Sequence, residues 1–176
     1  VWNLKIDADT DEKEIFLSGI LKGKIPEKLS IAIIDIPERK AIFDFLEYGV
    51  RIIKNPKISY DIKIVIGELD YVQQISDEIL ENIPSTFSLS QNYPNPFNPT
   101  TKLDYNLPLR SKVNISIYNV LGQEIKILVN EVKEYGYHST TWNGQDNLGR
   151  EMSSGVYFAR IISQGFTKTR KMLLVK

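Results

Sequence analysis

Short runs of alternating apolar and polar residues fill much of this sequence. The clearest in the first half are residues 14–21, 29–36, 41–48 with 50–53, and 60–66, all rich in Ile, Val, Phe and Tyr. Gly, Asn and Pro separate these runs. A period of two places alternate side chains on opposite faces of a strand, one on a core and the other in water. The pattern therefore predicts antiparallel sheets.

A change of pattern near residue 83 predicts two domains. Between residues 70 and 83 the apolar residues fall at helical spacing, and Asn82-Ile83-Pro84-Ser85 ends this pattern. Acidic residues outnumber basic ones by 16 to 11 up to residue 85, and basic residues lead by 11 to 6 after it, although the chain has 22 of each. We expect a β-sandwich accessory domain over 1–83, ending in a short helical or irregular linker, and a second domain over 84–176.

The second half carries seven candidate strands separated by turn signals, which is typical of an immunoglobulin-like sandwich. They are residues 87–91, 100–106, 112–118, 124–129, 136–142, 155–162 and 167–175. Between them, Gly122 is expected to supply a positive φ, Gly155 a close backbone approach or a bulge, and Trp142 a core side chain with a bonded indole N–H. The predicted fold class is all-β, with two small β-sandwich units, the C-terminal one immunoglobulin-like with about seven antiparallel strands.

The composition excludes several kinds of activity. Without cysteine there is no thiol catalysis, disulfide or thiolate metal site, and a single histidine cannot build the common zinc ligand sets. No apolar run approaches the roughly 18 residues of a membrane-spanning helix, and basic residues are not clustered as for nucleic acid. His138 has no acid at triad-like spacing, although a distant acid could fold beside it. We expect no catalytic residue, no cofactor and no nucleic-acid partner.

Two segments have a structural and a functional interpretation. Asp146 and Asn147 could bind Ca²⁺, but the spacing of an EF-hand loop is missing and a plain Asx-turn is favoured. Residues 168–176 place basic side chains beside an apolar stretch. This pattern predicts an edge strand protected by charge, or an edge to which a partner adds a strand.

The segment Tyr93-Pro94-Asn95-Pro96-Phe97-Asn98-Pro99 has prolines at three alternate positions. Each proline fixes φ, removes a backbone donor and restricts the residue before it. We expect a stiff, extended segment rather than a ladder strand. Tyr93 and Phe97 should pack on the sandwich, while Asn95 and Asn98 should bond to local backbone.

Five segments of the second half occur in the order and spacing of a known family. They are QNYPNPFNPTT (91–101), IYNVLGQ (117–123), GYHSTTWNGQDNLGR (136–150), SGVYF (154–158) and TRKMLLVK (169–176). Over about residues 84–176 the chain resembles the type A C-terminal sorting domain of the type IX (Por) secretion system. The family is related to the immunoglobulin-like domain of flagellar hook-capping proteins, which implies the same fold.

The resemblance implies a non-catalytic signal at the C-terminal end of a larger exported protein. Such domains direct cargo through the periplasm and across the outer membrane of Gram-negative-type bacteria, so the cargo is expected to be secreted or at the cell surface. The implied partners are the outer-membrane type IX machinery and a sortase-like peptidase, with release or attachment to surface lipopolysaccharide. The residues expected to serve partner recognition are Tyr93, Pro94, Asn95, Pro96, Phe97, Gly122, Gly155, Tyr157, Lys171 and Lys176.

Two other functions stay open. Trp2, Tyr48 and Tyr60 could form a stacking platform, so that residues 1–83 would be a carbohydrate- or adhesion-type binding module, although such aromatics are more often core residues. The chain could also be the C-terminal fragment of a secreted hydrolase whose catalytic domain lies upstream. Because the sequence starts at Val1 without an initiator Met, we expect a piece or a processed form of a longer protein.

Overall fold

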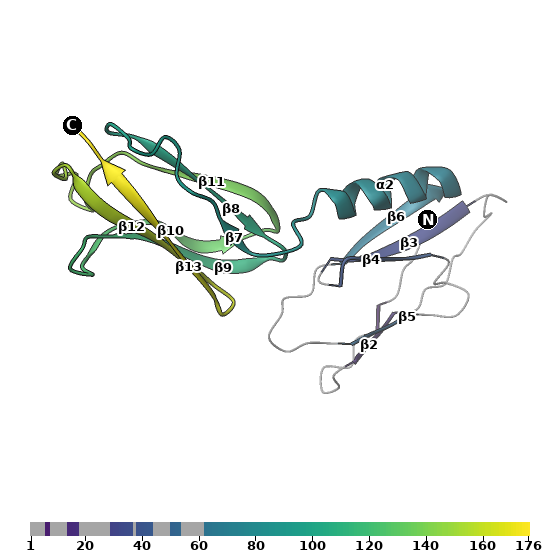
Figure 1. The fold of residues 1–176 in the computed structure, drawn as a ribbon. Helices are drawn as coiled ribbons and strands as arrows, with labels where there is room; N and C mark the ends of the chain where they lie inside the picture. The colour runs from purple at the N-terminus through teal and green to yellow at the C-terminus, as the bar shows by residue number, and fades with distance from the viewer. Residues whose placement is uncertain (1–5, 8–13, 18–28, 37, 44–49, 54–61) are drawn as a thin grey trace. The chain divides into compact units, whose positions relative to one another are not determined.

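The computed structural model of the chain describes residues 6–7, 14–17, 29–36, 38–43, 50–53 and 62–176. The backbone divides into two compact units, Val1–Ile83 and Pro84–Lys176 (Figure 1). Strands dominate both units and pair antiparallel in every sheet of the described residues, which confirms the predicted all-β fold class. Residues 18–21, 44–48 and 60–61 of the predicted strands lie outside the described part.

The first unit contains two three-stranded sheets within its described residues, with the orders β1-β2-β5 and β4-β3-β6. The strands are β1 (Ile6–Asp7), β2 (Glu14–Leu17), β3 (Leu29–Asp35), β4 (Lys40–Phe43), β5 (Val50–Ile53) and β6 (Ile62–Glu68). The segment expected as a short helical or irregular linker contains a helix, α2 (Leu69–Glu81), which contacts β3 and β6 (Figure 1).

Strand β3 is buried on both faces. Five apolar residues from Ile31 to Ile36 are no more than 5% exposed, and Val72 of α2 is buried with them. The expectation that one face of this run lies in water is therefore wrong for β3. Four consecutive apolar residues, 31–34, are typical of a strand that is covered on both sides rather than of a strict alternation.

The turn between β3 and β4 connects to the end of α2. Asp35 Oδ1 accepts a hydrogen bond from the Glu38 N–H at 3.1 Å. The guanidinium of Arg39 donates to the carbonyl oxygen of Leu80 at 2.9 Å and to that of Ile83. A cation that bonds to the last carbonyls of a helix satisfies orphan acceptors and complements the helix dipole.

The second unit is a sandwich of two antiparallel sheets with the orders β10-β9-β12-β13 and β11-β8-β7. All seven predicted strands of this half are present. They are β7 (Ser88–Leu89), β8 (Thr101–Leu107), β9 (Ser111–Tyr118), β10 (Glu124–Lys133), β11 (Gly136–Trp142), β12 (Gly155–Ser163) and β13 (Phe166–Leu174).

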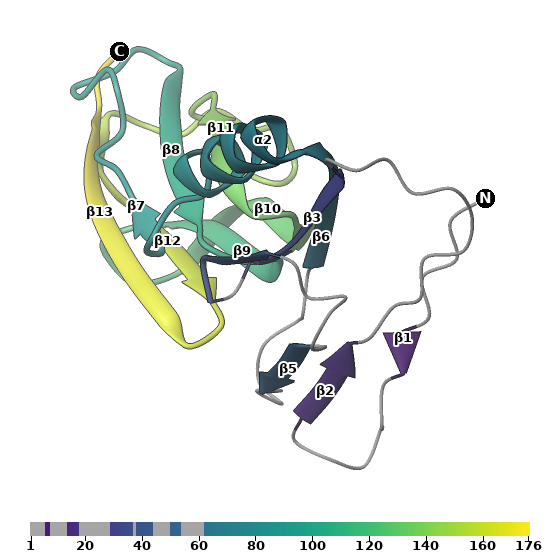
Figure 2. The same ribbon diagram turned by 90° about the vertical axis from the view of Figure 1, so that its right-hand side faces the viewer.

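The core of the second unit lies between its two sheets. In β8 the buried Leu103, Tyr105 and Leu107 alternate with the exposed Lys102 and Asp104, as period two requires. The same alternation holds in β12, whose inward residues belong to the same core. At one side of the sandwich β7 lies beside β13 (Figure 2).

Candidate functional site

The proline-rich segment follows the edge of β13 instead of joining a regular ladder. The Phe97 N–H donates to the Leu173 carbonyl at 3.0 Å, and the Val175 N–H donates to the Phe97 carbonyl at 2.9 Å. At the start of the segment, Tyr93 makes an isolated bridge to Lys102. An extended, non-ladder segment is therefore present, as predicted.

Asn95 bonds to β13 rather than to local backbone. Its Oδ1 accepts the Leu173 N–H at 2.9 Å, and its Nδ2 donates to the Lys171 carbonyl at 3.4 Å. The prediction of a local bond for Asn95 is therefore wrong. The Nε2 of Gln91 donates to the same Lys171 carbonyl at 2.7 Å. β13 is an edge strand, as expected, but its free edge is closed over residues 171–175 by this segment.

The two aromatic residues of the segment have opposite environments. Phe97 is 1% exposed and packs in the core, with its ring centroid 5.5 Å from that of Trp142. Tyr93 is 81% exposed, so the expectation that it packs on the sandwich is wrong. Trp142 also contacts Tyr157 at 4.9 Å between ring centroids, and its indole N–H donates to the Gln145 carbonyl at 2.8 Å, as predicted for this core residue.

The turn between β9 and β10 is built around Asn119. The Gly122 N–H donates to the Asn119 carbonyl at 3.0 Å, and the Asn119 N–H donates to the Gln123 carbonyl at 3.1 Å. Gly122 has a φ of 77°, which confirms its predicted positive φ. The Oδ1 of Asn119 accepts from the N–H groups of Leu121 and Gln123, both at 3.0 Å.

Asp146 organises the loop between β11 and β12. Its Oδ1 accepts from the N–H groups of Leu148 at 2.9 Å and Arg150 at 2.8 Å, and its Oδ2 accepts from the Arg150 guanidinium at 2.7 Å. Burial alone would raise the pKa of Asp146, but these hydrogen bonds and the Arg150 charge outweigh it and hold the pKa below the ordinary 3.8. Both carboxylate oxygens have partners, as in an Asx-turn, so the Ca²⁺ hypothesis gains no support.

The neighbouring Asn147 attaches this loop to β10. Its Oδ1 accepts the Ile127 N–H at 3.2 Å, and its own N–H donates to the Ile125 carbonyl at 3.1 Å. On the other side of the loop, a Cβ on Gly144 would lie 3.1 Å from the Pro99 carbonyl oxygen, so this position favours glycine for its close approach. Gly155 has nothing within 4 Å of such a Cβ, so the close approach predicted there is wrong.

The segments just described meet at one end of the sandwich, which we call the motif end: residues 93–100, 119–123, 143–154 and 174–176. The registers place it there, because Trp142 pairs with Thr101, Phe158 with Tyr118 and Gly155 with Leu174. Figure 1 shows the C-terminus at this end. Pro84 and the β12–β13 turn lie at the opposite end of the unit, where Ser163 pairs with Phe166.

The C-terminal residue is held at the motif end. The Lys176 ammonium lies 2.7 Å from a Glu151 carboxylate oxygen, and the Lys176 N–H donates to the Ser154 hydroxyl at 3.0 Å. The hydrogen bond and charge of Lys176 lower the pKa of Glu151. Among the other residues expected for recognition, Tyr157 is buried, whereas Pro94, Pro96 and Lys171 are exposed.

The described residues show no arrangement typical of a catalytic or metal site. His138 stacks on Tyr105 with 5.3 Å between ring centroids, and its Nε2 lies 2.8 Å from the Glu134 carbonyl oxygen. Within the described ranges no group of three His, Cys, Asp or Glu residues could hold a metal ion, and no helix is long and apolar enough to cross a membrane. Trp2, Tyr48 and Tyr60 lie outside the described residues.

A family model described as a secretion system C-terminal sorting domain matches residues 91–176. These residues belong to this family. The sequence resemblance is thus confirmed, with a match that begins at Gln91 and runs to the last residue. The sorting domain is an export signal of a cargo protein, and it directs cargo across the outer membrane of a Gram-negative-type bacterium to the surface or the medium.

Several solved structures are similar to the chain. PorZ, a surface component of the type IX secretion system of Porphyromonas gingivalis, is 18% identical and has a TM-score of 0.35, over 51% of this chain and 11% of PorZ. Dimeric latent PorU from the same organism is 11% identical with a TM-score of 0.42, over 92% of this chain and 18% of PorU. FlgD from P. aeruginosa is 27% identical and has a TM-score of 0.33, over 42% of this chain and 58% of FlgD. No curated protein matches.

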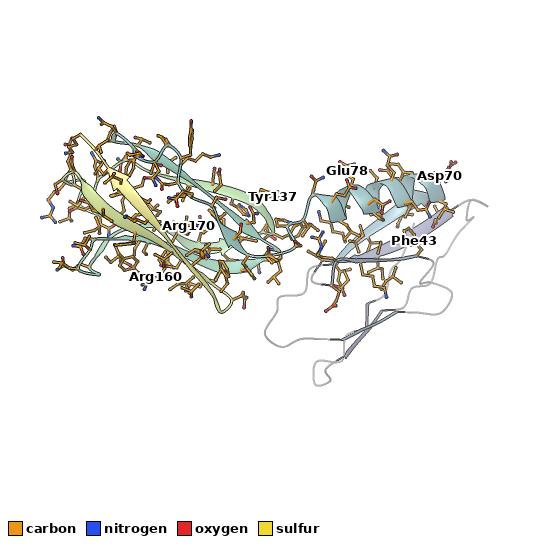
Figure 3. All side chains as sticks on the ribbon, in the orientation of Figure 1. Phe43, Asp70, Glu78, Tyr137, Arg160 and Arg170 are labelled. Atoms are coloured by element: carbon orange, nitrogen blue, oxygen red, sulfur yellow. The ribbon has the colours of Figure 1, made fainter. Side chains whose placement is uncertain are left out.

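Three features of the sorting domain were not predicted from its sequence. They are the closure of the β13 edge by Asn95, the close approach of Gly144 to Pro99, and the bond from Arg170 Nε to the Leu89 carbonyl at 2.8 Å. Figure 3 labels Arg170 on β13. Each joins segments that are distant in the chain. The short side chain of Asn95 between two prolines was the only local signal at that contact.

Proposed function

We propose that outer-membrane type IX machinery recognises the sorting domain at its motif end, and that the larger protein carrying it is secreted or held at the surface. One observation carries this proposal: the segments that resemble the family's motifs are far apart in the chain and yet meet beside the C-terminus. A receptor that contacts this end would contact several of them at once.

The predicted recognition residues have two roles in this proposal. Tyr93, Pro94, Pro96 and Lys171 are exposed and can contact a partner, as can the end of Lys176. Phe97 and Tyr157 are buried, so they support recognition by holding the segments in place.

We further propose that the chain itself is non-catalytic, that residues 1–83 are an accessory domain, and that a sortase-like peptidase processes the cargo. The cargo would then be released or attached to surface lipopolysaccharide. A carbohydrate-binding role of residues 1–83 and an upstream hydrolase domain stay predictions.

The test is to fuse residues 84–176 to a periplasmic reporter in a host that has the type IX apparatus. We expect the reporter to reach the surface or the medium, whereas the reporter alone stays in the periplasm. Retention of a folded fusion in the periplasm would contradict the proposal.

A truncation at the C-terminus needs a control for folding. Removing residues 171–176 would delete Met172 and Leu174, which are both 0% exposed, so loss of export could reflect unfolding. Removing only Val175 and Lys176 leaves the described core complete. We expect this shorter deletion to reduce export while the domain stays folded, with a small fall in melting temperature because the bonds of Val175 and Lys176 to Phe97, Ser154 and Glu151 are lost.

A further inference from the structure

The sorting domain builds the same turn twice at its motif end. The two sequences are Asn119-Val120-Leu121-Gly122-Gln123 and Asp146-Asn147-Leu148-Gly149-Arg150, which share an Asx residue, a leucine two positions later and a glycine after it. Both glycines have a φ of 77°. The two segments are 27 residues apart by number and belong to different connections between strands.

The hydrogen bonds of the two turns correspond one to one. In each turn the Asx side chain accepts from the N–H groups two and four residues later, at 3.0 and 3.0 Å for Asn119 and at 2.9 and 2.8 Å for Asp146. In each, the glycine N–H donates to the Asx carbonyl, and the Asx N–H donates to the carbonyl four residues later. These bonds fix both backbones without using the leucine side chains.

The fixed turns present their leucines to solvent. Leu121 is 79% exposed, Leu148 is 77% exposed, and Val120 beside Leu121 is 67% exposed. A surface leucine needs no explanation by itself, but two on matched, rigid turns form a preorganised apolar contact. Because the backbone is already ordered, a partner would bury these side chains without ordering a loop.

The two turns are neighbours. Asn147, which precedes Leu148, bonds to Ile125 and Ile127 at the start of β10, and β10 begins directly after the first turn. The Lys126 ammonium donates to the Asp146 carbonyl at 3.3 Å, which is a second link between them. The two leucines therefore lie at the tips of neighbouring turns at the motif end.

Two ion pairs lie beside the turns, and the Lys126 ammonium bonds there to a backbone carbonyl. The Arg150 Nε lies 2.7 Å from the Asp146 Oδ2, and the Lys176 Nζ lies 2.7 Å from the Glu151 Oε2. A partner surface of either charge would have to compete with these pairs, whereas an uncharged apolar surface would not. The surroundings of the leucines thus favour an apolar occupant.

We propose that Leu121 and Leu148, with Val120, form one binding site made of two neighbouring turns. Its partner is an uncharged, apolar concave surface on a protein of the export machinery. This inference rests on the proposed sorting function and names the contact through which it works. The turns supply the geometry, and the leucines supply the buried apolar area on binding.

The test compares paired substitutions in the reporter fusion of the full chain. We expect Leu121→Ser with Leu148→Ser to reduce the exported fraction at least tenfold, and Leu121→Met with Leu148→Met to retain export. Tyr137→Ser with Val132→Ser is the matched control, because these side chains are 65% and 51% exposed at the opposite end, and Figure 3 labels Tyr137 there. The control should be exported like the unchanged fusion.

The possible results separate the two proposals. If the unchanged fusion is not exported, the proposed function fails. If it is exported and the serine pair is exported equally, the docking inference is overturned. If the serine pair lowers the melting temperature of the domain, the exported fraction of Leu121→Asn with Leu148→Asn is compared with that of the unchanged fusion instead. Leucine-dependent sedimentation with phosphatidylethanolamine–phosphatidylglycerol vesicles would assign the tips to a membrane surface and also overturn the inference.

Discussion

Phe97 is expected to stabilise the sorting domain, whereas Tyr93, four residues earlier, is not. Phe97 is 1% exposed, and its ring lies 5.5 Å from that of Trp142 at an angle of 55°. Burial of a Phe side chain contributes about 1.5–3 kcal/mol, and an aromatic pair adds about 0.5–1.5 kcal/mol. With the cavity that truncation leaves, we expect Phe97→Ala to lower the free energy of unfolding by about 3–5 kcal/mol.

The matched variant is Tyr93→Ala, whose side chain is 81% exposed in the same segment. We expect it to change the free energy of unfolding by no more than about 0.5 kcal/mol. Denaturant unfolding of residues 84–176, followed by Trp142 fluorescence, measures the change in free energy of unfolding for both variants. Trp142 is the only tryptophan of this fragment, and its ring contacts Phe97. In a domain of this size the Phe97 variant should also melt at least about 12 °C lower.

The reasoning is refuted if Phe97→Ala costs less than about 1 kcal/mol, or if the two variants cost the same. The first result would mean that the segment does not close the core. The second would mean that Tyr93 is packed in solution.

Two pH dependences of opposite sign follow from the carboxyl groups. Burial of Asp35 raises its pKa above 3.8 despite the Glu38 hydrogen bond, so its favourable contribution is complete below pH 3.8 and is lost as the pH rises through the folded pKa. The free energy of unfolding of Asp35→Asn should therefore rise relative to that of the unchanged chain between pH 4 and pH 7. Denaturation followed by the circular dichroism signal of α2 measures both free energies. A difference between them that does not change with pH would contradict this. The pKa of Asp146 is lowered, so its contribution is present above pH 3.8 and is lost as the pH falls through the folded pKa. The stability difference between the sorting domain and its Asp146→Asn variant should shrink from pH 5 to pH 2 in acid titration of Trp142 fluorescence, and a widening difference would be inconsistent with it.

Much of the fold could be predicted because it depends on local pattern. Alternation located all seven strands of the sorting domain, and β11 has the predicted bounds, Gly136–Trp142. Gly122 was predicted correctly because its positive φ is a local requirement of the turn. The prediction for β10 ended at Val129, whereas the strand continues through residues 130–133, three of which are polar, and these are held by pairing with β9.

The contacts that build the candidate site could not be predicted in the same way. Asn95 was expected to bond locally, but Leu173, its partner, is 78 residues away. The side-chain chemistry of an asparagine serves both arrangements equally, and only the tertiary register selects one. The repeat of one turn at 119–123 and 146–150 is visible in sequence, but the adjacency of the two copies depends on the Asn147 contact with β10.

The two outer strands of the four-stranded sheet are both closed by asparagines near the motif end. Asn95 presents an acceptor and a donor to the edge of β13, and Asn147 does the same for β10 with its Oδ1 and its backbone N–H. An amide group matches the donors and acceptors of a neighbouring strand, so these bonds occupy positions that an added strand would need. A partner at this end must therefore bind mainly through side chains. This favours the leucine tips over strand addition at β13 as the contact that export requires.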